Sequence, residues 1–268
     1  MAGKLSIGTA WTEAAAFVRE ERRLLAPVVL GLIMVPAVIT SMVQPQVAPG
    51  ADPEPGMWMI VAILMVLVMV VGQLAIALLA IGWRASVGQA IGRAARRFPT
   101  VIAAGLIVMV PLFVFLTLMM LVTGATGAAP QQLGQSSIGR LSVPLALALG
   151  AATLFVAVRL LPLISIIANS DDGPLTALKR SFGMTQGNFW KLLGFLVLLS
   201  IGALVAGAAI SVVVGLLVTL AFGRPEAWSV SLLLIALAGG LIQAAFVTIY
   251  TAMMARIAVQ LDDRISGT

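Results

Sequence analysis

The sequence contains no cysteine and no histidine among its 268 residues. These absences exclude disulfides, thiolate nucleophiles, histidine general bases, histidine-ligated zinc and Ser-His-Asp catalysis. Lysine occurs only at Lys4, Lys179 and Lys191, outside the long apolar runs, so a buried Schiff-base lysine is also excluded. We therefore predict that the chain is not an enzyme and uses no metal or cofactor. An enzyme built on Asp, Glu, Ser, Thr or the single Tyr250 is the least favoured class.

Charged residues are also scarce, since they make up 10% of the chain, against about 25% in soluble domains. Hydrophobic residues make up 61%, and six runs reach the ~20 apolar residues that a membrane-spanning helix needs. This pattern predicts an all-α integral membrane protein with six transmembrane helices. The predicted spans are about Leu24 to Val43, Met57 to Trp83, Thr100 to Val122, Leu141 to Ala168, Leu192 to Phe222, and Trp228 to Ala255.

Lysine and arginine are distributed unequally between the two sets of connecting segments. Thirteen of the sixteen basic residues lie in segments 1–23, 84–99, 169–191 and 256–268, whereas only Arg140 and Arg224 lie in the alternate loops. Because cytoplasmic loops are enriched in Lys and Arg, we expect both termini in the cytoplasm. The net charge of +6 is then a property of one membrane surface and does not indicate nucleic-acid binding.

Three amphipathic segments are predicted on this basic face, each before a pair of spans. Apolar residues recur in them at helical spacing beside polar ones, which is typical of helices that lie in the membrane interface. The apolar stripes are Trp11, Ala14, Ala15 and Val18; Val87, Ile91, Ala94, Ala95 and Phe98, with Pro99 ending the helix; and Leu175, Leu178 and Phe182. The basic residues beside them are candidates for binding anionic phospholipids of the inner leaflet, namely Arg93, Arg96, Arg97, Lys179 and Arg180.

The whole chain, 1–268, is predicted to form a single membrane domain with a threefold layout. Each unit holds one surface helix and one transmembrane hairpin, over residues 1–83, 84–168 and 169–268. An internal duplication would explain this layout, but so would any six-helix chain with similar loops. Asp171 and Asp172, followed by Gly173 and Pro174, are interpreted as the start signal of the third surface helix.

Small residues recur at intervals of four in the last two spans. Such stripes let helix backbones approach closely, which replaces the missing hydrophobic driving force between helices in lipid. The stripes are Ala203, Gly207, Ser211 and Gly215 in the fifth span, and Ala236, Gly240 and Ala244 in the sixth. We expect them to face each other or a neighbouring helix, and a membrane-protein partner or a second copy of the chain remains open.

Arg159 is the one basic residue inside a predicted span, and Gln73 lies at similar depth in another. An ionisable residue at membrane depth costs about 2.5 kcal/mol or more and marks a candidate functional site. Arg159 is either a structural residue, snorkelling or paired with Gln73, or part of an inner-leaflet pocket that binds an anion or a lipid phosphate. Pro162 favours the second interpretation, since its missing N–H frees a backbone carbonyl. None of the spans contains a carboxylate, which argues against a proton-coupled transporter.

One stretch of some forty residues resembles a known pattern. Arg159-x-x-Pro162 is followed by Gly173-Pro174-Leu-Thr-Ala-Leu-Lys-Arg-Ser181-Phe-Gly-Met-Thr185-Gln-Gly187 and the next span. This resembles the membrane-domain superfamily associated with glycerophosphoryl diester phosphodiesterases, which includes free-standing bacterial inner-membrane proteins. The resemblance implies a bacterial inner-membrane location. It implies no phosphodiesterase activity, because that activity belongs to a separate barrel with histidines and metal-binding carboxylates.

Two functions are consistent with these patterns. The favoured one is a non-enzymatic multi-pass membrane protein that organises lipids or assists a membrane complex, and the charge distribution supports it. The alternative is a transporter or lipid-translocating permease with an anion or lipid-phosphate site near Arg159 and Gln73.

Overall fold

The computed structural model describes residues 7–45, 54–82, 86–125 and 137–266, and every regular element within these ranges is a helix. The first part of the chain forms α1 (Ile7–Glu20), α2 (Arg22–Val29), the π-helix η1 (Leu30–Met34) and α3 (Val35–Val43). The middle part forms α4 (Met57–Ala80), α5 (Val87–Ala125), α6 (Ser137–Leu160) and α7 (Leu163–Asn169). The last part forms α8 (Pro174–Met184), α9 (Phe189–Phe222) and α10 (Val230–Ser266).

The prediction of six membrane-spanning helices is confirmed. The six segments that are long and apolar enough are Arg22–Val43, Met57–Ala80, Val87–Val114, Gly150–Asn169, Phe189–Phe222 and Val230–Leu261. Each of them overlaps one predicted run. The chain is a multi-pass membrane protein by the length and composition of these helices.

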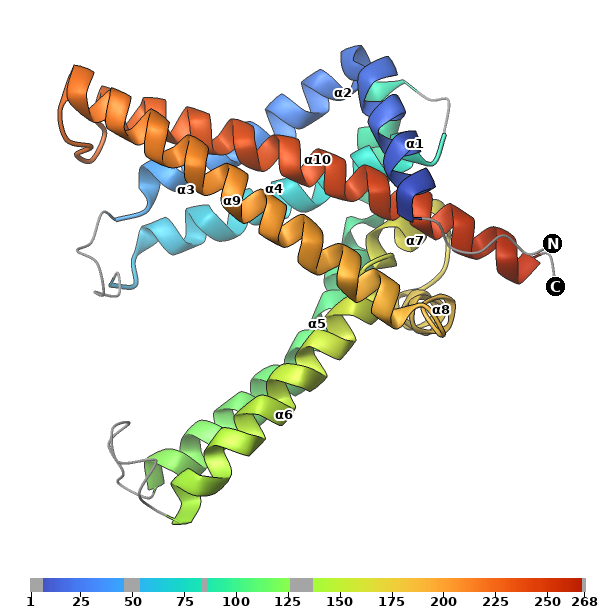
Figure 1. Cartoon of the computed structure of the whole chain (residues 1–268). Coiled ribbons are helices and arrows are strands. Elements are labelled where there is room, and N and C mark those ends of the chain that lie inside the picture. The colour runs from blue at the N-terminus through green and yellow to red at the C-terminus, as the bar shows by residue number, and fades with distance from the viewer. Residues whose placement is uncertain (1–6, 46–53, 83–85, 126–136, 267–268) are drawn as a thin grey trace.

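The helices meet at one end of the molecule and diverge towards the other (Figure 1). The short helices α7 and α8 lie at the end where the helices meet, beside the start of α1 and the last turns of α10. We call this region the junction end. From it, α3, α4, α9 and α10 extend in one direction, while α5 and α6 project together at an angle to them. The molecule is therefore V-shaped, with the V closed at the junction end.

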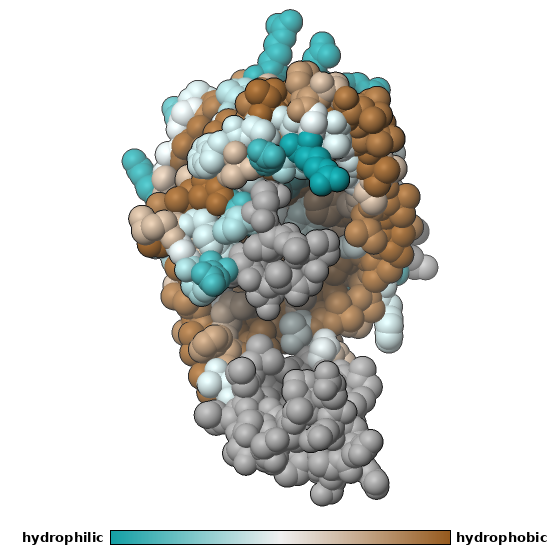
Figure 2. Space-filling model, turned by 90° about the vertical axis from the view of Figure 1, so that its left-hand side faces the viewer, coloured by the Kyte–Doolittle hydropathy of each residue, from teal (hydrophilic) through white to brown (hydrophobic). Residues whose placement is uncertain are grey.

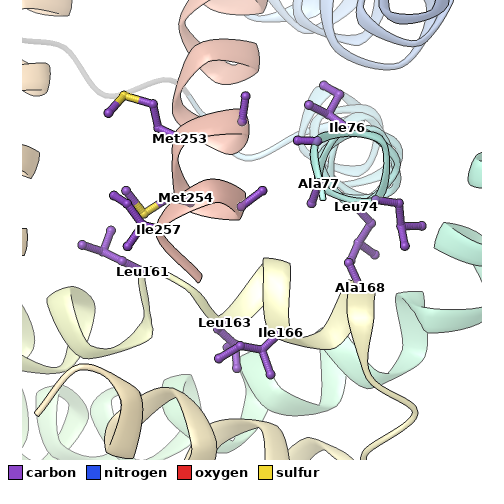
Figure 3. Packing of buried hydrophobic residues seen from close by; sticks show 14 of the residues in the cluster. Leu74, Ile76, Ala77, Leu161, Leu163, Ile166, Ala168, Met253, Met254 and Ile257 are labelled. Atoms are coloured by element: carbon purple, nitrogen blue, oxygen red, sulfur yellow. The ribbon is translucent and has the colours of Figure 1, made fainter. Parts of the chain in front are cut away.

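The buried core lies at the junction end. Figure 3 shows Met254 and Ile257 of α10 close to Leu161, with Leu74 and Ile76 of α4 across the core from them. All residues from Leu74 to Ala80 are buried, whereas Met57, Ile60 and Ile63 in the first half of α4 are exposed. Seen from the diverging end, apolar side chains cover the flanks of the molecule (Figure 2). An exposed apolar flank of this kind is what a lipid environment requires, because lipid tails are as apolar as the side chains.

The first span contains a π-helical turn, η1, in which the Val35 N–H donates to the Leu30 carbonyl. Pro36 has no N–H, so it cannot complete the regular α-helical bond to Leu32, and this favours the local change in winding. The turn packs directly onto Gly72 of α4. A Cβ atom at Gly72 would lie 2.8 Å from Ile33 Cδ1 and 3.1 Å from the Leu32 carbonyl oxygen. Only glycine fits this approach without a shift of the neighbouring backbone.

Two predicted helix boundaries are wrong, and proline explains both errors. Pro99 does not end a short surface helix, because α5 continues through it from Val87 to Ala125. Proline removes one hydrogen bond and bends a helix, but helical residues on both sides can retain the winding. In contrast, the fourth span is not one helix, because α6 ends at Leu160 and α7 begins at Leu163. Pro162 takes part in this break.

The surface helices α1 and α8 also pack on protein. In α1 the buried residues are Ala10, Ala14 and Phe17, whereas Trp11 of the predicted stripe is 48% exposed. In α8 Leu178 is buried and Leu175 is 60% exposed. Helix α1 lies against α10, and the placement of the apolar stripes at the membrane interface stays a prediction.

Candidate functional site

Arg159 lies in the last turn of α6 and reaches the carboxyl end of α8. Its Nη1 donates a hydrogen bond of 2.9 Å to the Phe182 carbonyl oxygen and one of 3.4 Å to Thr185 Oγ1. The last carbonyls of a helix have no partner within the helix and carry partial negative charge, so a guanidinium there is favourable. The guanidinium carbon also lies 5.0 Å from the centre of the Phe155 ring. Arg159 therefore fixes α8 against α6.

A second hydrogen bond joins the same two helices. Ser181 Oγ donates to the Arg159 carbonyl oxygen at 2.7 Å. This carbonyl would accept a helical bond from Leu163, but the break at Leu161 and Pro162 prevents that bond. Thr185 in turn donates to the carbonyl oxygen of Ser181 at 2.9 Å. Ser181 and Thr185 are both buried. We call Arg159, Ser181 and Thr185 the α6–α8 network.

The structure does not pair Arg159 with Gln73. Both hydrogen bonds of the Arg159 guanidinium go to α8, and Gln73 lies on α4, half-buried. The break at Pro162 places Arg159 in the last turn of α6, ten residues before the end of the span Gly150–Asn169. The Nε atom of Arg159 is buried and has no hydrogen-bond partner among the described residues.

Three arginines of α5 line a hollow beside the start of α8. The hollow has a volume of about 680 Å³, and its wall consists of Gly88, Gln89, Gly92, Arg93, Arg96, Arg97 and Asp171. A Cβ atom at Gly88 or Gly92 would meet nothing within 4 Å, so these glycines leave one side of the hollow open. We call this feature the arginine hollow.

Asp171 is the acidic residue of the arginine hollow. It forms an ion pair with Arg97, and its Oδ1 lies 3.8 Å from Nη2 of Arg93. Its interpretation as a helix-start signal is therefore incomplete, since it also connects the loop before α8 to α5. Three arginines and one carboxylate leave the hollow with excess positive charge.

Lys179 and Arg180 lie on α8 and not in the arginine hollow. Lys179 is exposed, and Nη1 of Arg180 lies 3.6 Å from Oδ2 of Asp172. An ion pair between partly exposed side chains contributes about 1 kcal/mol or less. The predicted basic residues thus form two groups, one on α5 and one on α8.

The small-residue stripe of the sixth span is buried at Ala236, Gly240 and Ala244. A Cβ atom at Gly240 would lie 2.9 Å from Val38 Cγ2, so this part of α10 packs on α3. The stripe of the fifth span is less buried. Ala203, Gly207 and Gly215 are half-buried and Ser211 is exposed, and Gly207 faces Ile242 of α10. Gly207 thus contacts α10 beside that stripe, at Ile242, whereas Gly240 of the α10 stripe packs against the first span.

The roles of Ser181, Thr185 and Asp171 were not recognised from the sequence. Ser181 and Thr185 stand in the segment quoted for the resemblance, four residues apart, so they share one face of α8. That spacing, after the Arg159-x-x-Pro162 sequence in the preceding span, was the available signal. A signal for the pairing of Asp171 with α5 was lacking, because that contact depends on how distant helices pack.

A family described as a domain of unknown function, DUF7847, matches residues 5–261. The chain belongs to this family. No curated protein and no solved structure matches the DUF7847 chain. Because the family description names no activity, the resemblance to the membrane domain of glycerophosphoryl diester phosphodiesterases stays a prediction.

Proposed function

We propose that this protein organises anionic lipids at one face of the membrane by binding their phosphate groups in the arginine hollow. The observation that carries the proposal is the position of Arg93, Arg96 and Arg97 on the first turns of a helix that continues as a membrane span. Arginine suits this ligand because its planar guanidinium can donate two parallel hydrogen bonds to a phosphate.

The length of α5 supports this placement. Its 39 residues correspond to about 58 Å at 1.5 Å per residue, well beyond the ~30 Å hydrocarbon layer. The basic turns would therefore lie at headgroup level while the later turns lie among acyl chains. Further along the same helix, Leu106, Met109 and Phe113 are exposed, with Phe113 at 72%. A lipid bound by its phosphate at the hollow would have apolar side chains beside its acyl chains.

The orientation in the membrane is part of the proposal. The arginine hollow, α1 and α8 lie at the junction end, where the basic segments of the chain gather (Figure 1). The positive-inside rule favours a cytoplasmic junction end, with both termini in the cytoplasm and the protein in a bacterial inner membrane. On this view α1 and α8 are amphipathic helices at the inner leaflet, and assistance to a membrane complex is a compatible role.

The permease alternative depends on Arg159. The hydrogen bonds of Arg159 to α8 favour a structural role for this side chain. The arginine hollow is therefore the better-supported anion site.

The test measures lipids that co-purify with the full chain in native-lipid particles, using mass spectrometry. The triple variant Arg93→Gln/Arg96→Gln/Arg97→Gln should lose most of its bound anionic lipid, since each lost ionic hydrogen bond weakens binding roughly tenfold. The matched control is Arg19→Gln/Arg22→Gln/Arg23→Gln, which removes the same charge from exposed positions before and within α2. Equal loss in both triple variants would show that general surface charge, and not the hollow, binds the lipid.

A further inference from the structure

A second cavity at the junction end lies away from the arginine hollow. It has a volume of about 230 Å³ and lies between the ends of α4, α7, α8 and α10. Its wall includes Ile81, Ser165, Asn169, Arg180 and Val259. Three of the eight residues that line the cavity have side chains that can donate hydrogen bonds, and the other five are apolar.

Ser165 is the clearest sign that this cavity is built for a ligand. The residue is 1% exposed, and its Oγ has no hydrogen-bond partner within the described part of the chain. Burying a hydroxyl group without a partner is unfavourable, so a buried orphan of this kind needs an explanation. A bound ligand that accepts a hydrogen bond from Ser165 would supply the missing partner.

Several other hydroxyl groups in the chain avoid this cost, although Thr251 of α10 is also buried without a partner among the described residues and does not line the cavity. Thr40, Ser170 and Thr248 each donate to the carbonyl oxygen four residues earlier, at 2.7 to 2.9 Å. Ser165 cannot use the same bond readily, because the residue four positions earlier is Leu161, in the break between α6 and α7. The break that allows the α6–α8 network therefore also leaves the Ser165 hydroxyl available.

The remaining polar groups suit an anion. Arg180 supplies the positive charge of a guanidinium with five N–H donors, and its Nη1 lies 3.6 Å from Oδ2 of Asp172. Asn169 adds an amide at the end of α7. A hydroxyl, an amide and a guanidinium around one cavity form a donor set for the oxygens of a phosphate group. The volume is several times the ~30 Å³ share of one water molecule, so a phosphate fits.

We propose that the cavity of Ser165, Asn169 and Arg180 is a phosphate-binding site, separate from the arginine hollow. The phosphate belongs either to a lipid headgroup or to a free phosphate in solution. If the phosphate belongs to a lipid, this inference rests on the proposed function, because the protein must first attract anionic lipids to this surface. It then adds a second site, which binds a single phosphate group. For free phosphate, the site stands on its own geometry.

The experiment uses the full chain in nanodiscs and measures its melting temperature and, by native mass spectrometry, its bound adducts. One set of nanodiscs contains phosphatidylcholine with added phosphatidic acid, and the other contains phosphatidylcholine alone with inorganic phosphate in the buffer. The variants are Ser165→Ala and Arg180→Gln. The matched controls are Ser170→Ala, whose hydroxyl bonds to its own helix, and Lys179→Gln, which neighbours Arg180 but lies outside the cavity.

We expect the cavity to hold one phosphate-containing adduct per chain, in addition to lipid held by the arginine hollow, and this adduct should be weakened roughly tenfold or more by Arg180→Gln and several-fold by Ser165→Ala, with both controls unchanged. Ser165→Ala should also melt at the same temperature as the wild type or higher without ligand, since it removes an unpaired hydroxyl, and should lose the stabilisation by ligand. An adduct found only with phosphatidic acid identifies the lipid headgroup, and one found with inorganic phosphate identifies the free anion.

The proposal is overturned if neither ligand binds to the wild type, or if the two cavity variants bind and melt like their controls in both sets of nanodiscs. The triple variant of the arginine hollow, measured alongside, separates this inference from the proposed function. If only the triple variant loses lipid, the lipid-organising function stands and the cavity site is refuted. If only the cavity variants lose their ligand, the arginine hollow is refuted and the cavity site stands.

Discussion

The junction end and the projecting helices α5 and α6 both contain apolar segments long enough to span a membrane, but they pack differently. At the junction end, Leu74 of α4 and Met253 of α10 have no exposed surface. In α5, by contrast, no described side chain beyond Ala104 is buried, and Phe113 is 72% exposed. Hydrophobicity alone therefore does not decide which helices pack together in this protein. Small residues and side-chain hydrogen bonds mark the packed region, in agreement with the forces that act between helices in lipid.

Arg159→Leu should disrupt the packed region most strongly. The substitution leaves the Phe182 carbonyl without its charged partner and removes the contact with the Phe155 ring. Hydrogen bonds to charged groups contribute about 1.5–3 kcal/mol, so we expect a loss of about 3 kcal/mol in the free energy of unfolding. Unfolding in mixed detergent micelles measures it.

Arg224→Leu is the control for this prediction, because Arg224 is exposed in the loop between α9 and α10 and should change stability little. A loss that is equally small in both variants would contradict a positioning role for Arg159. That result would favour the permease alternative, in which Arg159, whose buried Nε has no partner among the described residues, binds an anion.

Gly72→Ala sharpens the comparison by testing close helix packing. The added Cβ atom would lie 2.8 Å from Ile33 and 3.1 Å from a backbone oxygen, and overpacking of this kind costs about 1–3 kcal/mol. Gly215→Ala on α9 is the matched control, because nothing lies within 4 Å of its added Cβ. Thermal unfolding of the two variants should differ by several degrees. Equal melting temperatures would mean that α4 and the first span do not approach each other so closely.

Asp171→Asn should have the smallest effect on the fold and a measurable effect on binding. Asp171 is 82% exposed, so its ion pairs with Arg93 and Arg97 contribute little to stability. Without its charge, the arginine hollow should bind anionic lipid several-fold more tightly, since the competing carboxylate is gone. Titration of vesicles containing anionic lipid measures the change, and Asp172→Asn is the control. Weaker binding in Asp171→Asn would show that Asp171 holds the arginines in their binding positions.

The sequence was sufficient to predict six spans, because length and hydropathy are local properties of a run of residues. It was insufficient for the partner of Arg159, because the distance from α6 to α8 depends on how the chain folds back after Pro162. The same reason explains Asp171, which joins a loop to α5. Proline gave an ambiguous signal: Pro162 takes part in a helix break, whereas α5 continues through Pro99.

The stripes of small residues also show that the sequence can identify a packing position without identifying the helix that packs there. The sequence identified Gly240 as a packing position, and a Cβ atom there would indeed lie 2.9 Å from Val38. It did not identify the neighbour, because a small-residue stripe is compatible with any helix that can approach it. In α9 the same pattern leaves Ser211 exposed, so periodicity of small residues alone does not measure burial.

The attachment of α5 and α6 near one end has a mechanical consequence. Buried residues of α5 lie at Ala90, Ala94 and Ala104, and those of the described part of α6 lie at Val158, all towards the junction end. The part of α5 beyond Ala104 is about 32 Å long at 1.5 Å per residue, so a rotation of about 5° at its base moves its far end by about 3 Å. The α5–α6 pair is thus a lever, so a small rearrangement where the helices meet would be amplified into a larger displacement of its distant end.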